Sequence, residues 1–207
     1  DPGVLGANYP VDVPLLGDAK LGLAALNVAL ATLQRRLEVT AVRKAKEEKF
    51  ARFHSLASSD DKPIKPERVV LEVAQALDPD TIVVADAGTP CPYFSAYYKV
   101  RGTGRHFFSN RAHGALGYSM SAAIGAHFAR PQVKCLAIMG DGSFGFTCGE
   151  LETAVRYRLP VTFIVISNAT YGWIKAGQKS GYGQRYFSVD FDSTDHAAVA
   201  AAFGVKS

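Results

Sequence analysis

The chain has 207 residues, of which 48% are hydrophobic and 20% charged, so it can bury a substantial core. Its net charge of +4 is mild, with Lys and Arg spread along the chain, which argues against a nucleic-acid partner. No apolar run approaches the roughly 20 residues of a membrane span, and the start, Asp1-Pro2-Gly3, carries no secretion signal. We therefore expect a cytoplasmic protein with no membrane partner.

The first segment, residues 1–33, begins as extended chain rich in Pro and Gly and continues as a helix. Asp18 can cap this helix, which we place at residues 19–37, and Leu21, Ala25, Val28 and Leu30 form an apolar stripe that we expect to pack. Residues 34–65 are rich in charge and Ser and predict a charged helix followed by a linker. The chain has no initiator Met, so we expect a piece of a longer protein.

Regular alternation begins at Pro66, and residues 66–207 predict one domain. Helices are expected at residues 67–77, 114–129, 150–158 and 196–203, and strands at 81–86, 134–139 and 161–167. Strands and helices that alternate at this length imply an α/β fold with a parallel sheet covered by helices on both faces. Because the chain stops soon after Gly204, which ends the last helix, we expect the domain to be incomplete at its carboxyl end.

The three cysteines, Cys91, Cys135 and Cys148, are scattered and form no C-x-x-C pair. This pattern argues against a disulfide framework and against a structural zinc site. We expect three reduced thiols.

Three unusual loops follow the three predicted strands: "DAGTP" (86–90), "GDGSFG" (140–145) and "NATYG" (168–172). In parallel α/β sheets, ligands bind beyond the carboxyl ends of the strands. The sequence therefore predicts one site built from all three loops.

Gly140, Gly142 and Gly145 have the G-x-G-x-x-G spacing of a dinucleotide-binding turn. A nicotinamide or flavin site would also have an acidic residue about 20 residues further on, to hold the ribose. Here the next strand ends in Ser167-Asn168, and the acidic residue, Asp141, stands inside the turn. It would repel a pyrophosphate unless a divalent cation lay between them.

Magnesium fits this pattern, because it takes about six oxygen ligands and shares them between carboxylates and phosphates. Asp141 and Asn168, at the ends of neighbouring strands, can supply two ligands, and the carbonyl of Thr170 a third. Gly142 and Ser143 would offer backbone N–H groups to a diphosphate at the amino end of a helix, where the helix dipole favours an anion.

The GDG turn, a spacer and an Asn that closes the next strand together resemble the thiamine diphosphate signature of the family that includes acetolactate synthase, benzoylformate decarboxylase and pyruvate decarboxylase. The family's signature usually ends in Asn-Asn and here ends in Ser167-Asn168, which keeps the second Asn, the usual metal ligand. "GALGYSMSAAIGA" (114–126) resembles the family's G-x-[LM]-G-[FY]-x-x-P-A-A-I-G-A helix, with Ser121 in place of the common Pro. "SNATYGWIKAGQ" (167–178) is similar to its cofactor loop, and residues 8–20 resemble the end of its central domain.

The resemblance implies roles for particular residues. Leu116 matches the apolar residue that bends the cofactor into a V, while the carbonyl of Gly114 and the N–H of Leu116 would hold the pyrimidine edge. Gly88 and Thr89 match the loop over the diphosphate, although Pro90 follows where other members often have a donor. The remaining cofactor-binding positions are Gly140, Asp141, Gly142, Ser143, Asn168, Thr170, Tyr171 and Gly172. His113 either faces substrate or only packs in its loop.

By the same resemblance, the chain is expected to be part of a thiamine diphosphate- and Mg²⁺-dependent enzyme that acts on a 2-oxo acid by decarboxylation, acetolactate synthase-like carboligation or both. The glutamate that activates the cofactor has no counterpart in this chain. It would come from a pyrimidine-binding domain, usually of a neighbouring subunit in a dimer or tetramer. The alternatives are a cofactor-binding module without turnover, a nicotinamide-binding domain, or a subunit of a split 2-oxo acid decarboxylase.

Overall fold

The computed structural model describes residues 3–33 and 38–207, and the chain divides into two compact units, Asp1–Lys46 and Glu47–Ser207. Residues 34–37, where we predicted the end of the first helix and the start of the charged segment, lie outside the described residues. So do the first two residues of the sequence. The boundaries predicted at 33/34 and 65/66 stay predictions.

The first unit contains helix α1 (Ala19–Leu30), which Asp18 caps as predicted: Asp18 Oδ1 accepts a hydrogen bond from the Leu21 N–H at 3.0 Å. The expected packing of the apolar stripe is not seen, because no residue of α1 is buried and Val28 is 77% exposed. Helix α2 (Thr40–Ala57) begins in this unit and ends in the second.

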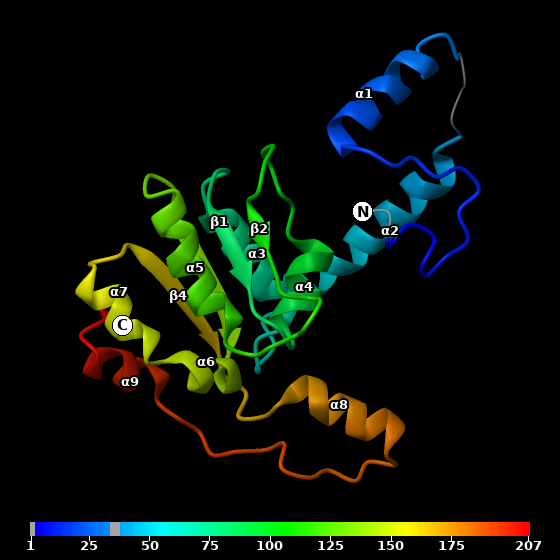
Figure 1. Cartoon of the computed structure of the whole chain (residues 1–207). Helices are drawn as coiled ribbons and strands as arrows, with labels where there is room; N and C mark the ends of the chain where they lie inside the picture. Colours follow the sequence, from blue (N-terminus) through cyan, green and yellow to red (C-terminus); the bar gives the residue numbers. More distant parts are fainter. Residues whose placement is uncertain (1–2, 34–37) are drawn as a thin grey trace. The chain divides into compact units, whose positions relative to one another are not determined.

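The second unit is built on a four-stranded sheet in which every neighbouring pair of strands is parallel (Figure 1). Its strands, in the order β2-β1-β3-β4, are β2 (Phe107–Phe108), β1 (Ile82–Ala85), β3 (Cys135–Gly140) and β4 (Val161–Ile166). Gly140 is paired in register with Ile166. The carboxyl ends of β3 and β4 therefore meet at one edge, as the site prediction requires.

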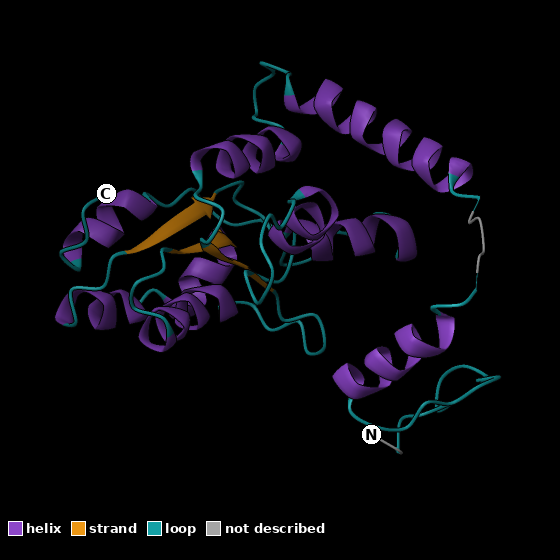
Figure 2. Ribbon diagram, turned by 90° about the horizontal axis from the view of Figure 1, so that it is seen from above, coloured by secondary structure: helices purple, strands orange, loops and turns teal. Residues whose placement is uncertain are grey.

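Helices cover both faces of the sheet, which confirms the predicted α/β class (Figure 2). Side chains alternate along a strand, so Ile82 and Val84 enter one core while Val83 and Ala85 enter the other. The first core is shared with α5 (Tyr118–Ala129), α6 (Asp141–Thr147), α7 (Glu150–Arg156) and α9 (His196–Ala202). The second is shared with the end of α2, with α3 (Pro66–Ala76) and with α4 (Pro90–Tyr97).

Three elements add to those that the sequence pattern predicted: β2, α4 and α8 (Gly172–Gly181). The helix whose amino end was expected at Gly142 and Ser143 is α6. Helix α6 begins at Asp141 itself, so the glycine turn leads directly from β3 into a helix. Gly204 has a φ of +88° and follows α9, in agreement with the predicted helix end.

Cys91, Cys135 and Cys148 are free thiols. Within the part of the chain that the structure describes, no helix has both the length and the apolarity needed to cross a bilayer.

Candidate cofactor site

Asp141 lies where the loops after β3 and β4 meet, and its carboxylate contacts the second loop directly. Its Oδ2 atom accepts hydrogen bonds from the N–H groups of Asn168 at 2.7 Å and Ala169 at 2.6 Å, and from the Ser167 hydroxyl at 3.3 Å. Its Oδ1 atom accepts from the Gly142 N–H at 2.8 Å. The structure thus brings the two predicted metal ligands, Asp141 and Asn168, side by side.

The backbone of the second loop is shaped for this contact. Ala169 has a φ of +53°, a left-handed conformation that non-glycine residues rarely adopt. Successive N–H groups in such a turn can converge on one anion, and here both converge on a carboxylate that is only 6% exposed. Hydrogen bonds from the protein therefore compensate for the burial of the Asp141 carboxylate.

The other predicted ligand oxygens lie in the same short loop. Asn168 Oδ1 accepts from the Thr170 N–H at 3.4 Å, and the Thr170 carbonyl accepts from the Gly172 N–H at 2.9 Å. Across residues 3–33 and 38–207, no group of three or more His, Cys, Asp or Glu could hold a metal. One carboxylate with neutral oxygens is a donor set suited to a hard cation that also binds phosphate.

Glycines allow the three loops to approach one another closely. A Cβ on Gly142 would lie 2.4 Å from Cε1 of Tyr171, so the tyrosine ring rests on the first turn of α6. A Cβ on Gly172 would lie 3.5 Å from Thr89 Oγ1. Gly140 is the N-cap residue of α6. Two predicted residues of the loop after β4 therefore lie against the other loops: Tyr171 against the first turn of α6, and Gly172 against the loop after β1.

Leu116 joins the same cluster from the segment before α5. A Cβ on Gly88, whose φ is +87°, would lie 3.7 Å from Leu116 Cδ2. Gly114 has a φ of +70° and is exposed, and His113 lies in an exposed turn. The structure brings Leu116 to the loop after β1; His113 shows no feature that assigns it a role.

The sequence pattern did not single out Asp86, which lies between these segments with no exposed surface. It accepts hydrogen bonds from the backbone of Gly117 and Ser119 and from the Ser143 hydroxyl. The signal that could have found it is its place at the end of the buried strand "TIVVA", which matches the place of Asp141 after β3.

Cys91, near the start of α4, is another polar group close to the loop after β1. Burial alone would raise the pKa of its thiol, but hydrogen bonds from Ser109, Arg111 and Ser95 lower that pKa below the ordinary value. The Ser109 hydroxyl donates to Cys91 Sγ at 2.9 Å. Cys91 is only 4% exposed, so its thiol is a well-packed group rather than an accessible nucleophile.

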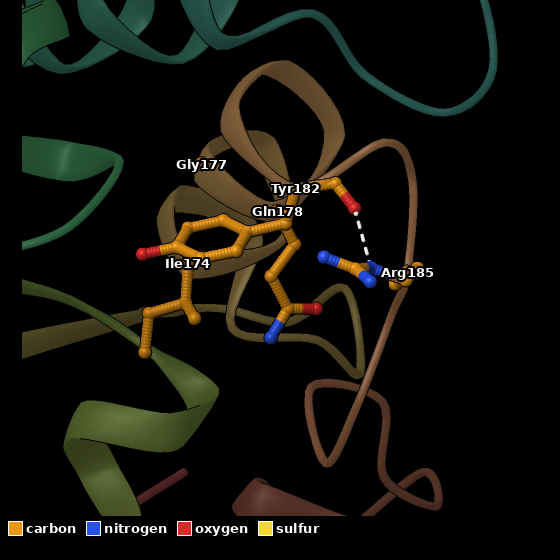
Figure 3. Close-up of a pocket in the computed structure, with 5 residues that line it drawn as sticks. All are labelled: Ile174, Gly177, Gln178, Tyr182 and Arg185. Atoms are coloured by element: carbon orange, nitrogen blue, oxygen red, sulfur yellow. Dashed lines mark hydrogen bonds between the residues drawn. The ribbon is translucent and has the colours of Figure 1, made fainter.

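A pocket on α8 and the loop after it does not coincide with this cluster (Figure 3). It is lined by Ile174, Gly177, Gln178, Tyr182 and Arg185. Arg185 Nε donates to the Tyr182 carbonyl at 3.1 Å, the bond that is dashed in the figure. None of the predicted cofactor residues lines it.

A parallel sheet with glycine-rich loops and a buried carboxylate at its carboxyl edge defines an α/β domain of the class that binds phosphate-bearing cofactors. Residues 86–207 match the family described as thiamine pyrophosphate enzyme, C-terminal TPP binding domain. The chain belongs to this family, thiamine pyrophosphate being another name for thiamine diphosphate. The predicted family membership is confirmed.

Curated relatives are similar over the whole chain or nearly so. A probable acetolactate synthase large subunit of Methanococcus aeolicus is 33% identical and matches 100% of the chain. The benzoylformate decarboxylase of Pseudomonas aeruginosa is 32% identical over 100% of the chain, and the pyruvate oxidase of Lactiplantibacillus plantarum is 30% identical over 97%. The chain spans 37%, 37% and 33% of the length of these relatives, respectively.

Proposed function

We propose that this chain supplies the diphosphate half of the active site in a thiamine diphosphate- and Mg²⁺-dependent enzyme that acts on a 2-oxo acid. The reaction would be decarboxylation, carboligation of the acetolactate synthase type, or both. Family membership and the names of the relatives support the cofactor and the substrate class. The observation that carries the assignment to this edge of the sheet is the direct contact between Asp141 and the loop of Asn168.

The residues present fit a magnesium diphosphate. The Asp141 carboxylate, the Asn168 side-chain oxygen and the Thr170 carbonyl would bind the cation, and diphosphate oxygens would complete its shell. The N–H groups of Gly142 and Ser143 lie in the first turn of α6, where no carbonyl of a preceding turn accepts from them. The Gly142 N–H donates to Asp141 Oδ1 in the structure, and in the proposed complex it would share this bond with the diphosphate. The remaining groups that would surround the diphosphate are Gly88, Thr89, Tyr171 and Gly172.

Thiamine diphosphate supplies a carbon nucleophile that adds to the ketone of a 2-oxo acid. The chain's own contribution is binding and orientation. The half-buried Leu116 would support the bent cofactor, and Gly114 and Leu116 would hold the pyrimidine edge through their backbone. A fixed geometry of the bound cofactor would make removal of the proton from its thiazolium carbon nearly intramolecular. This would lower the entropic part of the activation barrier.

The rest of the active site would come from outside this chain. The carboxylate that activates the pyrimidine would be contributed by a pyrimidine-binding domain, most simply from a neighbouring subunit of a dimer or tetramer. A cytoplasmic location is a further part of this proposal. His113 keeps the two roles that the sequence allows: it either faces substrate or only packs in its loop.

Calorimetric titration of the chain tests the proposal directly. With Mg²⁺ present, thiamine diphosphate should bind and NAD should not, and removal of the metal with a chelator should abolish the binding. Binding of NAD in place of thiamine diphosphate would instead support a nicotinamide-binding domain. Metal-independent binding of thiamine diphosphate would contradict the magnesium site.

A further inference from the structure

Asp86 is a fully buried carboxylate that joins three segments of the second unit. Its Oδ1 atom accepts hydrogen bonds from the Gly117 N–H at 3.1 Å and from the Ser143 hydroxyl at 3.0 Å. Its Oδ2 atom accepts from the Ser119 N–H at 2.7 Å. The side chain at the end of β1 thereby binds both the start of α5 and the first turn of α6.

The arrangement replaces an ordinary helix cap. Gly117, the N-cap residue of α5, has no side chain, so no local group satisfies the first N–H groups of the helix. From the end of β1, Asp86 accepts from the N–H of Gly117 and from one N–H of the first turn, that of Ser119. Its charge also suits the positive end of the α5 dipole. Burying a carboxylate is costly unless hydrogen bonds compensate it, and here its partners are two N–H groups and one hydroxyl.

The segments that Asp86 joins are those with the proposed contacts to opposite ends of the cofactor. Leu116, proposed to support the rings, directly precedes Gly117, and the N–H of Ser143 is proposed to bind the diphosphate. A further bond links the Gly117 segment to the other end of α6, because the hydroxyl of Thr147, the last residue of α6, donates to the Gly117 carbonyl at 3.2 Å. The spacing between these segments is thus set by bonds inside the protein.

We propose that Asp86 is a positioning residue that holds the Leu116–Gly117 segment at a fixed distance from the amino end of α6, so that one rigid geometry accepts both the rings and the diphosphate of the cofactor. This inference rests on the proposed function. It requires no contact between Asp86 and the cofactor, since the carboxylate acts through the segments that it binds.

The proposal predicts that substitution of Asp86 weakens the binding of one ligand much more than that of another. Thiamine diphosphate touches both segments, whereas inorganic diphosphate touches only the amino end of α6 and its neighbouring loops. Asp86→Asn keeps the shape of the side chain but turns one acceptor into an NH₂ group that faces an N–H donor. In the presence of Mg²⁺ it should weaken thiamine diphosphate binding to the chain at least 10-fold, about 1.4 kcal/mol, and inorganic diphosphate binding by less than about 3-fold.

Val83→Ala is the matched control, because Val83 lies in the same strand, is 0% exposed and packs in the other core. It should lower the midpoint of urea unfolding through a cavity and leave the ratio of the two affinities unchanged. If Asp86→Asn does not fold, Ser143→Ala is the milder variant: it removes one hydrogen bond to Asp86 and keeps the Ser143 N–H. It should change the ratio in the same direction by a smaller factor.

The outcomes separate this inference from the proposed function. If the parent chain binds neither ligand with Mg²⁺, both fail. If the parent binds both ligands and the Asp86 variant loses the same factor for each, or has the affinity ratio of Val83→Ala, Asp86 is only a structural residue and the inference is overturned. A selective loss of thiamine diphosphate affinity supports it.

Discussion

The Asp141 carboxylate has one role in the folded structure and a second role in the proposed complex. In the structure its carboxylate anchors the loop after β4 through the N–H groups of Asn168 and Ala169. In the proposed complex the same carboxylate binds the cation, and the cation offsets the repulsion between this carboxylate and the diphosphate. Both roles need a negative charge at a nearly buried position, which explains why an acidic residue occupies a turn that would otherwise repel phosphate.

Asp141→Ala should weaken the Mg²⁺-dependent binding of thiamine diphosphate by more than 10-fold, about 1.4 kcal/mol. The variant removes a cation ligand and leaves the loop of Asn168 without its anchor. Calorimetric titration of parent and variant at equal Mg²⁺ measures the effect. Asp192→Ala, which removes an exposed carboxylate before α9, should leave the affinity unchanged. Equal affinities for the parent and Asp141→Ala would refute the metal assignment.

Leu116→Ala tests the other end of the cofactor. In the complete enzyme this variant should lower kcat, because the rings lose their apolar support, while most of the affinity for the diphosphate remains. Steady-state kinetics and cofactor titration of the same preparation separate the two effects. A variant with normal turnover and lost cofactor binding would show that Leu116 has a different role.

At the scale of elements, the sequence predicted those whose signal is local. β1, β3 and β4 are apolar runs, and α3, α5, α7 and α9 follow helical patterns or caps. β2 has two residues and exists because Phe107 and Phe108 pair with β1, a contact that no local pattern reveals. α4 begins Pro-Cys-Pro, and α8 contains Gly172, Gly177 and Gly181, so both have the composition of loops and need tertiary context to form helices.

The residues of the candidate site also divide into those that a local sequence pattern marks and those that only the fold brings together. Asp141 and Asn168 could be predicted because a glycine motif and the ends of neighbouring strands mark them. Asp86 could not be assigned a role, since its partners are 31, 33 and 57 residues away along the chain. Only the folded sheet brings the end of β1 to the starts of α5 and α6.

Two glycines of the α5 region give a paired test of this geometry. Gly117 has a φ of +88°, and a Cβ there would lie 2.7 Å from Thr147 Cγ2. Gly117→Ala should therefore destabilise the protein by about 1–3 kcal/mol through backbone strain and a clash. Gly125, inside α5, has open space where a Cβ would lie, with no atom within 4 Å apart from its chain neighbours and the backbone of α5 itself.

Gly125→Ala should have the opposite effect and stabilise the helix by about 0.5–1 kcal/mol, since alanine restricts the unfolded chain. Urea unfolding of both variants measures the difference. If both alanines had the same effect, the start of α5 would not depend on the left-handed backbone at Gly117.

At the scale of the whole molecule, the chain is proposed to bind one end of the cofactor and to leave the other end to a second domain. Its family match covers a C-terminal cofactor-binding domain, and its relatives are about three times as long. In the proposed function the described loops supply metal ligands and diphosphate donors, but no carboxylate of the sequence matches the one that would activate the pyrimidine. The proposed enzyme therefore needs a second domain to complete its active site.

The last prediction follows from this division: the 207-residue chain alone should not turn over pyruvate or benzoylformate, even when saturated with Mg²⁺ and thiamine diphosphate. Without the activating carboxylate, no group of this chain would help the pyrimidine to act as the base for the thiazolium carbon. General acid–base catalysis of this kind contributes about 10²- to 10⁴-fold, and exposure of the pyrimidine to water should increase the loss.

Adding the amino-terminal domains of the same enzyme, in one chain or as a separate one, should restore consumption of the 2-oxo acid. With separate chains, the rate should rise with their concentration and then saturate, because an active site formed at an interface depends on association. The concentration series therefore tests where the missing carboxylate lies. If the isolated chain turned over substrate as fast as the reconstituted enzyme, the activating group would have to lie within these residues, and the chain would hold a complete active site.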